Sequence, residues 1–351
     1  GAFKRLPAGH SAMLGDRRAT IIGFAGALLV LAGLIWFIGP QDILDGLSAA
    51  DPAMVALVLL AAAGWVSAWG MSLWTVLRAL GAPIPAWKAI AVFTSAMFAN
   101  NVTPFGQAGG EPVSALLISR AADSDYEDGL AAIASVDTMH FAPSIGLTLV
   151  GITFVLLQGV TPGRNILFAT GILAVLTVGF VIAALVGWRY RYRVESLIVA
   201  GMTPIVSAVR RILPGHSELS SNAIERRIEN FFHSIERVAT DRKTIAMAIG
   251  FSALGWFSLS LALWFAVTAV GADVPLGPVL LVAPLGSIAG FTPLPGGSGA
   301  IEGAFAGLLV AATGISAGLA FSGVMVHRAA TYWLLTLIGG GVASAIGANG
   351  S

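Results

Sequence analysis

The sequence predicts an all-α, polytopic membrane protein with about six transmembrane helices and two re-entrant helical hairpins arranged as an inverted repeat. Hydrophobic residues make up 56% of the chain and charged residues only 11%, against roughly 25% charged residues in soluble domains. Long uncharged stretches reach the roughly 20 residues that a helix needs to cross the apolar core of a bilayer. Two further apolar stretches are interrupted by glycine and proline.

The chain, residues 1–351, is expected to form a single membrane domain. Six stretches are apolar enough and long enough to span a bilayer. The first of them lacks an end that resembles a cleavage site, so we expect no cleavable signal peptide. The expected spans are at about 19–38, 52–77, 128–159, 165–188, 243–271 and 317–347.

Two other segments, 88–120 and 277–315, are apolar at both ends and polar in the middle. The first reads N-N-V-T-P-F-G-Q-A-G-G-E over Asn100–Glu111, and the second reads T-P-L-P-G-G-S-G-A-I-E over Thr292–Glu302. Broken backbone is tolerated at membrane depth only where it is buried in protein or lines a wet cavity. Each segment is therefore predicted to form two half-helices joined by a turn, and we call them the first and second hairpins.

The basic residues predict the orientation in the membrane. If each hairpin returns to the side from which it enters, all but two of the 19 Lys and Arg residues fall on one face, the exceptions being Arg164 and Arg328. Basic residues accumulate on the cytoplasmic side of membrane proteins. We therefore expect a multi-pass protein of the cell membrane with both termini in the cytoplasm. The first hairpin would enter from the inside and the second from the outside.

The segment 190–242 contains the only long polar stretch and carries an amphipathic pattern. Arginine and glutamate occupy most of the face opposite the apolar residues. Two interpretations stay open, namely an interfacial helix on the inner leaflet and a helix packed on the cytoplasmic ends of the other helices. The apolar residues that recur at helical spacing are Ile224, Ile228, Phe231, Phe232, Ile235 and Val238.

The two hairpins share a sequence pattern, in which Thr-Pro is followed by glycines and then by glutamate. A charged residue follows each glutamate 26 positions later, Asp137 after Glu111 and Arg328 after Glu302. Segments 52–159 and 243–347 are therefore predicted to be repeats of opposite orientation. Inverted repeats with broken helices that meet near the bilayer midplane are a recurring architecture of transporters.

These same motifs carry a family resemblance. The run P-L-P-G-G-S-G-A-I-E over Pro293–Glu302, followed by Arg328 and Trp333, and the N-V-T-P run with Gly109-Gly110-Glu111 resemble the lysylphosphatidylglycerol synthase transmembrane-region family. Its members are also described as flippase-like integral membrane proteins, and the resemblance covers most of the chain. It implies lipid translocation between leaflets. The best-known members carry a cytoplasmic aminoacyl-transferase domain after the membrane region. Since this sequence stops after its last span, we expect no such synthase activity here. Other members are linked to polyprenyl or dolichyl sugar-lipid and hopanoid pathways.

Four ionisable residues are predicted at membrane depth, where each costs about 2.5–3.5 kcal/mol on insertion scales. The planar guanidinium of Arg328 suits a lipid phosphate, although a structural ion pair with Asp137 or a glutamate is also possible. Glu111 and Glu302 either cap the second half-helices or bind a cationic headgroup, a sugar or a proton. Asp137 is expected to belong to a charge pair.

The remaining candidates surround these charges. The hairpin glycines permit tight turns and close helix approach, or let backbone N–H groups face an anion. The asparagines either line a cavity or cap a half-helix, and His140 lies one turn after Asp137, where a buried structural histidine is the alternative. The candidate substrate-binding residues are Arg328, Glu302, Glu111, Asp137, Asn100, Asn101, Gly109, Gly110, Gly296, Gly297, Ser298 and His140.

The sequence predicts a transporter rather than an enzyme. The absence of cysteine excludes thiolate metal sites and cysteine nucleophiles, and we expect no cofactor, metal or catalytic residue. The predicted function is a flippase for a phospholipid or a polyprenyl-linked sugar lipid. The alternatives are a membrane enzyme or enzyme subunit acting on lipid-linked sugars, and a scaffold that recruits a cytoplasmic synthase. The expected partners are membrane lipids, a lipid-modifying enzyme or glycosyltransferase and further copies of the chain, but no nucleic acid.

Overall fold

The computed structural model describes residues 32–36, 39–103, 107–157 and 221–349, and the regular structure in these ranges is helical throughout. Among them, four helices are long and apolar enough to cross a bilayer: α3 (Pro52–Ala79), α6 (Tyr126–Leu157), α10 (Arg242–Ala269) and the continuous helix Ala317–Ala348. The all-α membrane fold is thereby confirmed. The expected span 165–188 and most of the span 19–38 lie outside the described residues.

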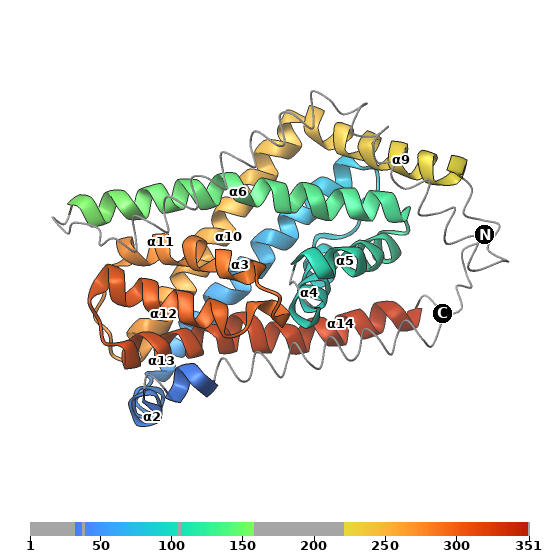
Figure 1. Cartoon of the computed structure of the whole chain (residues 1–351). Helices are drawn as coiled ribbons and strands as arrows, with labels where there is room; N and C mark the ends of the chain where they lie inside the picture. Colours follow the sequence, from blue (N-terminus) through green and yellow to red (C-terminus); the bar gives the residue numbers. More distant parts are fainter. Residues whose placement is uncertain (1–31, 37–38, 104–106, 158–220, 350–351) are drawn as a thin grey trace.

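Shorter helices complete the described part of the chain (Figure 1). The long C-terminal helix consists of two α-helical parts with a π-helical turn, η3, between them. The other elements, in chain order, are α2 (Pro40–Ser48), α4 (Ala86–Val102), α5 (Gln107–Ala122), α9 (Ser221–Thr240), α11 (Leu276–Ser287), η1 (Ile288–Phe291), η2 (Pro295–Gly297), α12 (Ala300–Thr313), α13 (Ala317–Arg328), η3 (Ala329–Leu334) and α14 (Leu335–Asn349).

The chain breaks in both segments that the sequence singled out. In the first, α4 ends at Val102 and α5 begins at Gln107; in the second, α11 ends at Ser287 and α12 begins at Ala300. The helices of each pair pack against each other. Helices α4 and α5 lie toward the end of the molecule that carries α9, and α11 and α12 lie toward the opposite end (Figure 1). The entry of each pair into a membrane from its own side stays a prediction.

Helices α3 and α10, the first helices of the two predicted repeats, begin and end alike. Each has 28 residues and begins after an aspartate whose carboxylate accepts hydrogen bonds from backbone N–H groups of the first turn, Asp51 in α3 and Asp241 in α10. Each is followed by a glycine with positive φ, Gly81 (77°) and Gly271 (86°). The two helices also pack along each other. They therefore form a common centre for the two proposed repeats.

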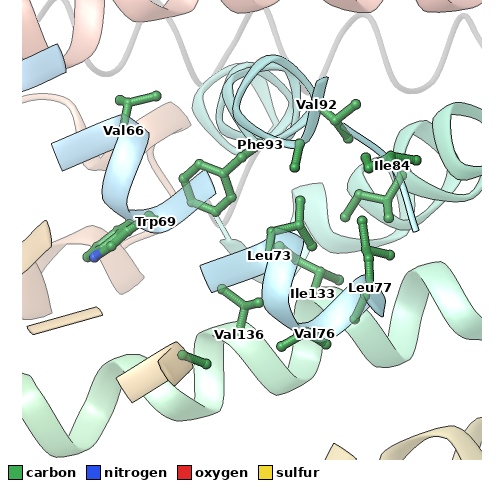
Figure 2. Packing of buried hydrophobic residues seen from close by; sticks show 14 of the residues in the cluster. Val66, Trp69, Leu73, Val76, Leu77, Ile84, Val92, Phe93, Ile133 and Val136 are labelled. Carbon is green, nitrogen blue, oxygen red and sulfur yellow. The ribbon is translucent and has the colours of Figure 1, made fainter. Parts of the chain in front are cut away.

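The largest group of buried apolar side chains surrounds α3. Leu73, Val76 and Leu77 are fully buried, and they lie among apolar residues of α4 and α6, including Phe93 and Ile133 (Figure 2). Lipid tails are as apolar as these side chains, so helix association in a membrane depends on close packing rather than on water exclusion. The burial here therefore contributes mainly through dispersion contacts and shape.

Glycines provide that close packing at two helix crossings. A Cβ atom added to Gly70 of α3 would lie 2.6 Å from the Cα of Ile90, and one added to Gly339 of α14 would lie 2.3 Å from the carbonyl oxygen of Thr94. Both neighbours belong to α4. Small residues at such crossings let two backbones approach, so α4 is held between α3 and α14.

Helix α9 packs on the start of α6. Its cytoplasmic side and a place on the inner leaflet stay predictions. Ser234 and Arg237 both donate to Asp128 Oδ1, at 2.6 and 3.0 Å. Arg237 also donates to the carbonyl oxygen of Leu80, at 3.1 Å, where α3 ends. Val238 is buried beside these contacts. The amphipathic helix is therefore attached to the protein through Asp128.

We expect Asp128→Ala to loosen α9 by about 1–2 kcal/mol, because two hydrogen bonds are lost and the ion pair with Arg237 is partly exposed to solvent. Hydrogen–deuterium exchange of the α9 amides in detergent measures the change. Glu229→Ala is the matched control, since Glu229 lies on the exposed face of the same helix. Equal exchange rates in the two variants would contradict the role of Asp128.

Candidate functional site

A cavity with a volume of about 260 Å³ lies among α3, α4, α6, α10, α13 and the second hairpin. Polar and aromatic side chains from both hairpins and from the long helices line it. Six of the twelve candidate residues are among them, namely Asn100, Asn101, Asp137, His140, Gly296 and Arg328. The other six lie outside the lining.

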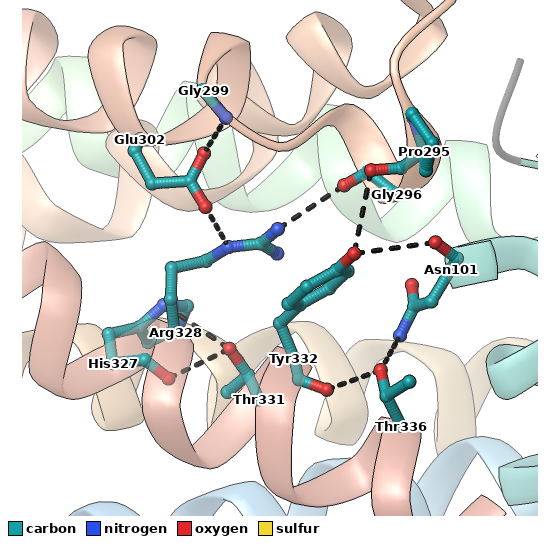
Figure 3. Close-up of polar contacts among 10 residues, drawn as sticks. All are labelled: Asn101, Pro295, Gly296, Gly299, Glu302, His327, Arg328, Thr331, Tyr332 and Thr336. Carbon is teal, nitrogen blue, oxygen red and sulfur yellow. Dashed lines mark hydrogen bonds and ion pairs between the residues drawn. The ribbon is translucent and has the colours of Figure 1, made fainter. Parts of the chain in front are cut away.

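Arg328, the last residue of α13, is held at the cavity wall by three contacts. Its Nε donates to Glu302 Oε1 at 2.7 Å, and its Nη2 donates to the carbonyl oxygen of Gly296 at 3.2 Å (Figure 3). Its guanidinium carbon lies 4.2 Å from the ring centroid of Tyr332. The side chains of Arg328 and Glu302 are 9% and 3% exposed. The buried ion pair anticipated from the sequence is thus made with Glu302 rather than with Asp137.

Glu302 also caps the helix to which it belongs. Its Oε2 accepts a hydrogen bond from the backbone N–H of Gly299, the residue before α12. This is the capping arrangement in which the third helical residue reaches back to the N-cap. Both carboxylate oxygens therefore have partners, and through them Glu302 joins the start of α12 to the end of α13.

Glu111 of the first hairpin has a different position. Helix α5 begins at Gln107, so Glu111 lies beyond the first turn and cannot cap the helix. The capping interpretation is wrong for Glu111, because the helix starts four residues before the glutamate. Gly109 and Gly110 lie inside α5, and a Cβ atom added to Gly110 would lie 2.1 Å from Asn100 Oδ1. Gly110 therefore permits close packing of α5 against α4.

The turn of the second hairpin is compact and uses its own N–H groups. Gly296, Gly297 and Gly299 have φ angles of 56°, 63° and 86°, which side chains with a Cβ rarely adopt. The N–H of Gly297 donates to Leu294 O at 2.9 Å and that of Ser298 to Pro295 O at 3.1 Å. The N–H groups of Gly297 and Ser298 are therefore used within the turn itself. The positive φ angles explain why glycine occupies these three positions.

Tyr332 connects the two hairpins, and the sequence analysis missed it. Its hydroxyl donates to the carbonyl oxygen of Asn101 at 3.3 Å and lies 3.5 Å from that of Pro295. Nearby, Asn101 Nδ2 donates to Thr336 Oγ1 at 2.8 Å (Figure 3). Tyr332 belongs to the π-helical turn η3, a feature that often marks functional sites. Its position four residues after Arg328 could have identified it in the sequence, because residues with this spacing are neighbours on a helix surface.

Aromatic side chains form the other end of the cavity. Trp65 and Trp69 of α3 and Trp256 of α10 line it together with His140 of α6. The His140 ring stacks on Trp69 with 3.9 Å between centroids and an interplanar angle of 22°. Trp69 also meets Trp65 and Trp256 edge to face, at 5.3 and 5.4 Å. The signal in the sequence was two tryptophans four residues apart inside a span, away from the interfaces where tryptophan is usually enriched.

The model of the lysylphosphatidylglycerol synthase transmembrane region matches residues 23–339 of this chain. The protein belongs to this family. The resemblance inferred from the hairpin motifs is therefore confirmed, and the assignment fits a lipid-related function in the membrane. The match includes both hairpins and the whole of the cavity lining.

Relatives of this family member span nearly its full length. A UPF0104 membrane protein from Methanothermobacter thermautotrophicus is 27% identical over 92% of this chain and 92% of its own length. One from Pyrococcus horikoshii is 24% identical over 90% of this chain and 93% of its own. The glycosyltransferase AglD from Haloferax volcanii is 28% identical over 92% of this chain, but the match covers 54% of AglD.

Asp137 and His140 lie on one face of α6 in this member of the lysylphosphatidylglycerol synthase transmembrane-region family. Asp137 Oδ1 is 3.9 Å from His140 Nδ1, which is too long for a hydrogen bond. Within the ranges that the structure describes, no group of three or more His, Asp or Glu side chains is placed to hold a metal ion. Asp137 and His140 therefore contribute polar groups to the cavity wall.

Proposed function

We propose that this protein is a lipid flippase that moves a phosphate-bearing lipid between the leaflets of the cell membrane. The lipid would be a phospholipid or a polyprenyl-linked sugar lipid. The observation that carries the proposal is the guanidinium of Arg328, which is buried at the wall of a mostly apolar cavity that both broken helical segments help to line. Its family membership and the spanning helices agree with a substrate drawn from the bilayer.

The guanidinium keeps hydrogen-bonding capacity for a phosphate. Arginine has five N–H groups in a planar fork. In the described part of the chain, Glu302 takes the Nε–H and Gly296 takes one N–H of Nη2, whereas Nη1 has no hydrogen-bond partner. A phosphate oxygen at Nη1 would therefore add a charge-assisted bond without breaking the pair with Glu302. Glu302 meanwhile fixes the direction in which the fork points.

The proposed path of the lipid between the leaflets is based on the position of the cavity. The headgroup would occupy the cavity between the turns of the two hairpins while the tails stay in the bilayer. Rearrangement of the hairpin turns around Arg328 would then open the cavity first to one leaflet and then to the other. Paired broken helices around a fixed site are a common plan for such exchange. The headgroup leaves chemically unchanged, so the proposed activity is not enzymatic.

The proposed orientation places both termini and α9 in the cytoplasm. Its support is the distribution of basic residues along the chain. The contacts of Arg237 with Asp128 and Leu80 add to it, because they put α9 at the end of the molecule where α3 ends and α6 begins. Arg78, the basic residue in the last turn of α3, lies at the same end.

The similarity to AglD favours a second candidate function. AglD is named as a glycosyltransferase, and this chain matches about half of its length. The alternative is that this protein acts on lipid-linked sugars as an enzyme subunit or together with a glycosyltransferase partner. It predicts sugar transfer that depends on the partner, whereas the flippase proposal predicts leaflet exchange by the protein alone.

Lipid exchange in proteoliposomes tests the proposal. We expect the neutral double variant Arg328→Gln/Glu302→Gln to exchange a phospholipid or a polyprenyl-phosphate sugar about 10–100-fold more slowly than the unmodified protein, because a charged hydrogen bond to phosphate contributes about 1.5–3 kcal/mol. Fluorescent lipids and a membrane-impermeant quencher report the rate.

The double variant leaves no unpaired buried charge, so its folding can be matched to that of the unmodified protein by thermal unfolding. Arg120→Gln is the control for loss of a positive charge, because Arg120 is exposed at the end of α5. Folded, unmodified protein that exchanges neither lipid class would remove the flippase proposal. Unchanged exchange in the folded double variant would instead remove Arg328 as the phosphate contact.

A further inference from the structure

We infer that the aromatic end of the cavity is a second subsite, which binds the neutral, hydroxyl-rich part of a lipid headgroup such as a sugar or polyol. This subsite consists of Trp65, Trp69, His140 and Trp256, which line the cavity beside Asp137. The inference rests on the proposed function, because it assumes that the phosphate of the same lipid is held by Arg328.

Unsatisfied nitrogen atoms indicate that a polar ligand belongs in this cavity. Trp65 Nε1 and His140 Nε2 have no hydrogen-bond partner among the described residues. Both side chains line the cavity, and their residues are 5% and 6% exposed. Buried polar groups in native proteins nearly always have a partner, so an occupant with hydrogen-bonding groups would complete this site.

The chemistry of these nitrogens favours hydroxyl groups. An indole Nε1–H can only donate, while a neutral imidazole Nε2 donates or accepts according to its tautomer. A phosphate or another pure acceptor can satisfy Trp65 and His140 only when His140 carries its proton on Nε2, and it cannot donate to the carboxylate of Asp137. A hydroxyl donates and accepts, so several hydroxyls on one group can satisfy both nitrogens in either tautomer of His140 and also donate to the carboxylate of Asp137.

The aromatic rings supply the apolar part of the subsite. The neighbouring indoles have their own hydrogen bonds, Trp69 Nε1 to Ser252 O at 3.3 Å and Trp256 Nε1 to His140 O at 2.9 Å. Those bonds fix the two indoles around the His140 ring. A polyol ring, which has apolar C–H groups as well as hydroxyls, fits such mixed walls better than a simple alkyl group or an isolated charge.

The two unsatisfied nitrogens are covered by neighbouring atoms in the present state. Binding therefore requires the rings of Trp65 and His140 to turn toward the cavity. Arg328 lines the same cavity as these two side chains, so the phosphate and the hydroxyl groups of one headgroup would share a single site.

Two lipids that differ only in their hydroxyls test the inference. Phosphatidylinositol and phosphatidylethanol both carry one phosphodiester charge, but only the former has a polyol headgroup. We expect the unmodified protein to bind phosphatidylinositol about 5–10-fold more tightly, as native mass spectrometry from detergent micelles would measure, because one or two net hydrogen bonds correspond to that ratio. Trp65→Phe/His140→Phe, which keeps both rings but removes the unsatisfied nitrogens, should reduce the ratio to near one.

The control is Trp87→Phe, since Trp87 is 71% exposed and outside the cavity, and it should keep the ratio. Equal binding of the two lipids by the unmodified protein, or an unchanged ratio in the folded double variant, would overturn the subsite alone. Binding of neither lipid would overturn the phosphate contact as well. Competition by free myo-inositol would confirm a polyol site but assign it to a soluble ligand, and its failure to compete would assign the site to lipid headgroups.

Discussion

Replacing Glu302 with alanine should lower the free energy of unfolding by about 3–5 kcal/mol, because it leaves the buried charge of Arg328 without its partner. The variant also removes the cap on the N-terminus of α12, where Glu302 accepts from Gly299. Unfolding by heat or by a denaturing detergent, starting from the same mild detergent, measures the loss.

Glu111→Ala is the matched control, because it removes the corresponding glutamate of the other hairpin. Glu111 is half-buried inside α5 and is not part of a cap, so its loss should cost about 1 kcal/mol or less, as for ordinary substitutions away from a specific network. Glu302→Gln/Arg328→Gln should recover much of the stability, since neither charge remains. Equal losses for the two alanine variants would show that the ion pair does not hold the second hairpin.

The different roles of the two glutamates mark a limit of the sequence pattern. Both follow glycines in the sequence, and both precede a charged residue by 26 positions. The pattern does not show where each helix begins. Helix α5 starts four residues before Glu111, whereas α12 starts only two residues before Glu302. This difference of two residues decides whether the carboxylate can reach the N-cap.

In the described part of the chain, hydropathy and helix-breaking residues predicted the four long helices and the positions of the breaks. These properties are local, because a span is set by its length and apolarity and a break by glycine and proline. Arg328 was recognisable for the same reason, as a charge inside an apolar run is costly wherever it packs. Its partner was not, since Glu302 and Asp137 satisfied the pattern equally.

The aromatic end of the cavity and the role of Tyr332 depend on contacts between distant parts of the chain. Tyr332 meets Asn101 across 231 positions, and Trp256 donates to His140 across 116. No periodicity in the sequence carries such pairings, which arise from the tertiary packing of helices around the cavity, η3 beside α4 in the first case and α10 beside α6 in the second. The tryptophans inside α3 were nevertheless a usable sign, because buried indoles need a partner or an occupant.

Tyr332→Ala should also have a large effect. We expect it to lower the free energy of unfolding by about 3–5 kcal/mol, as deletions of buried aromatic rings do in other proteins. The ring supports the guanidinium of Arg328 at 4.2 Å, and its edge fills the space beside Gly296, where an added Cβ would lie 2.2 Å from Tyr332 Cε2. Removal of the ring should free Arg328 to change position and weaken the contact between α4 and the turn of the second hairpin. The rate of lipid exchange in proteoliposomes should therefore fall as well.

Tyr332→Phe separates the ring from the hydroxyl. It keeps the contact with Arg328 but loses the bond to Asn101 O, so we expect a loss of only about 0.5–1.5 kcal/mol. Tyr126→Phe is the control, because that hydroxyl also donates to a backbone carbonyl, of Pro112, but at an exposed position. If the hydroxyl holds the two hairpins together, Tyr332→Phe should alter the rate of lipid exchange while Tyr126→Phe does not. Exchange at the unmodified rate in folded Tyr332→Phe would mean that the ring alone matters, and that the hairpins move without a hydrogen bond between them.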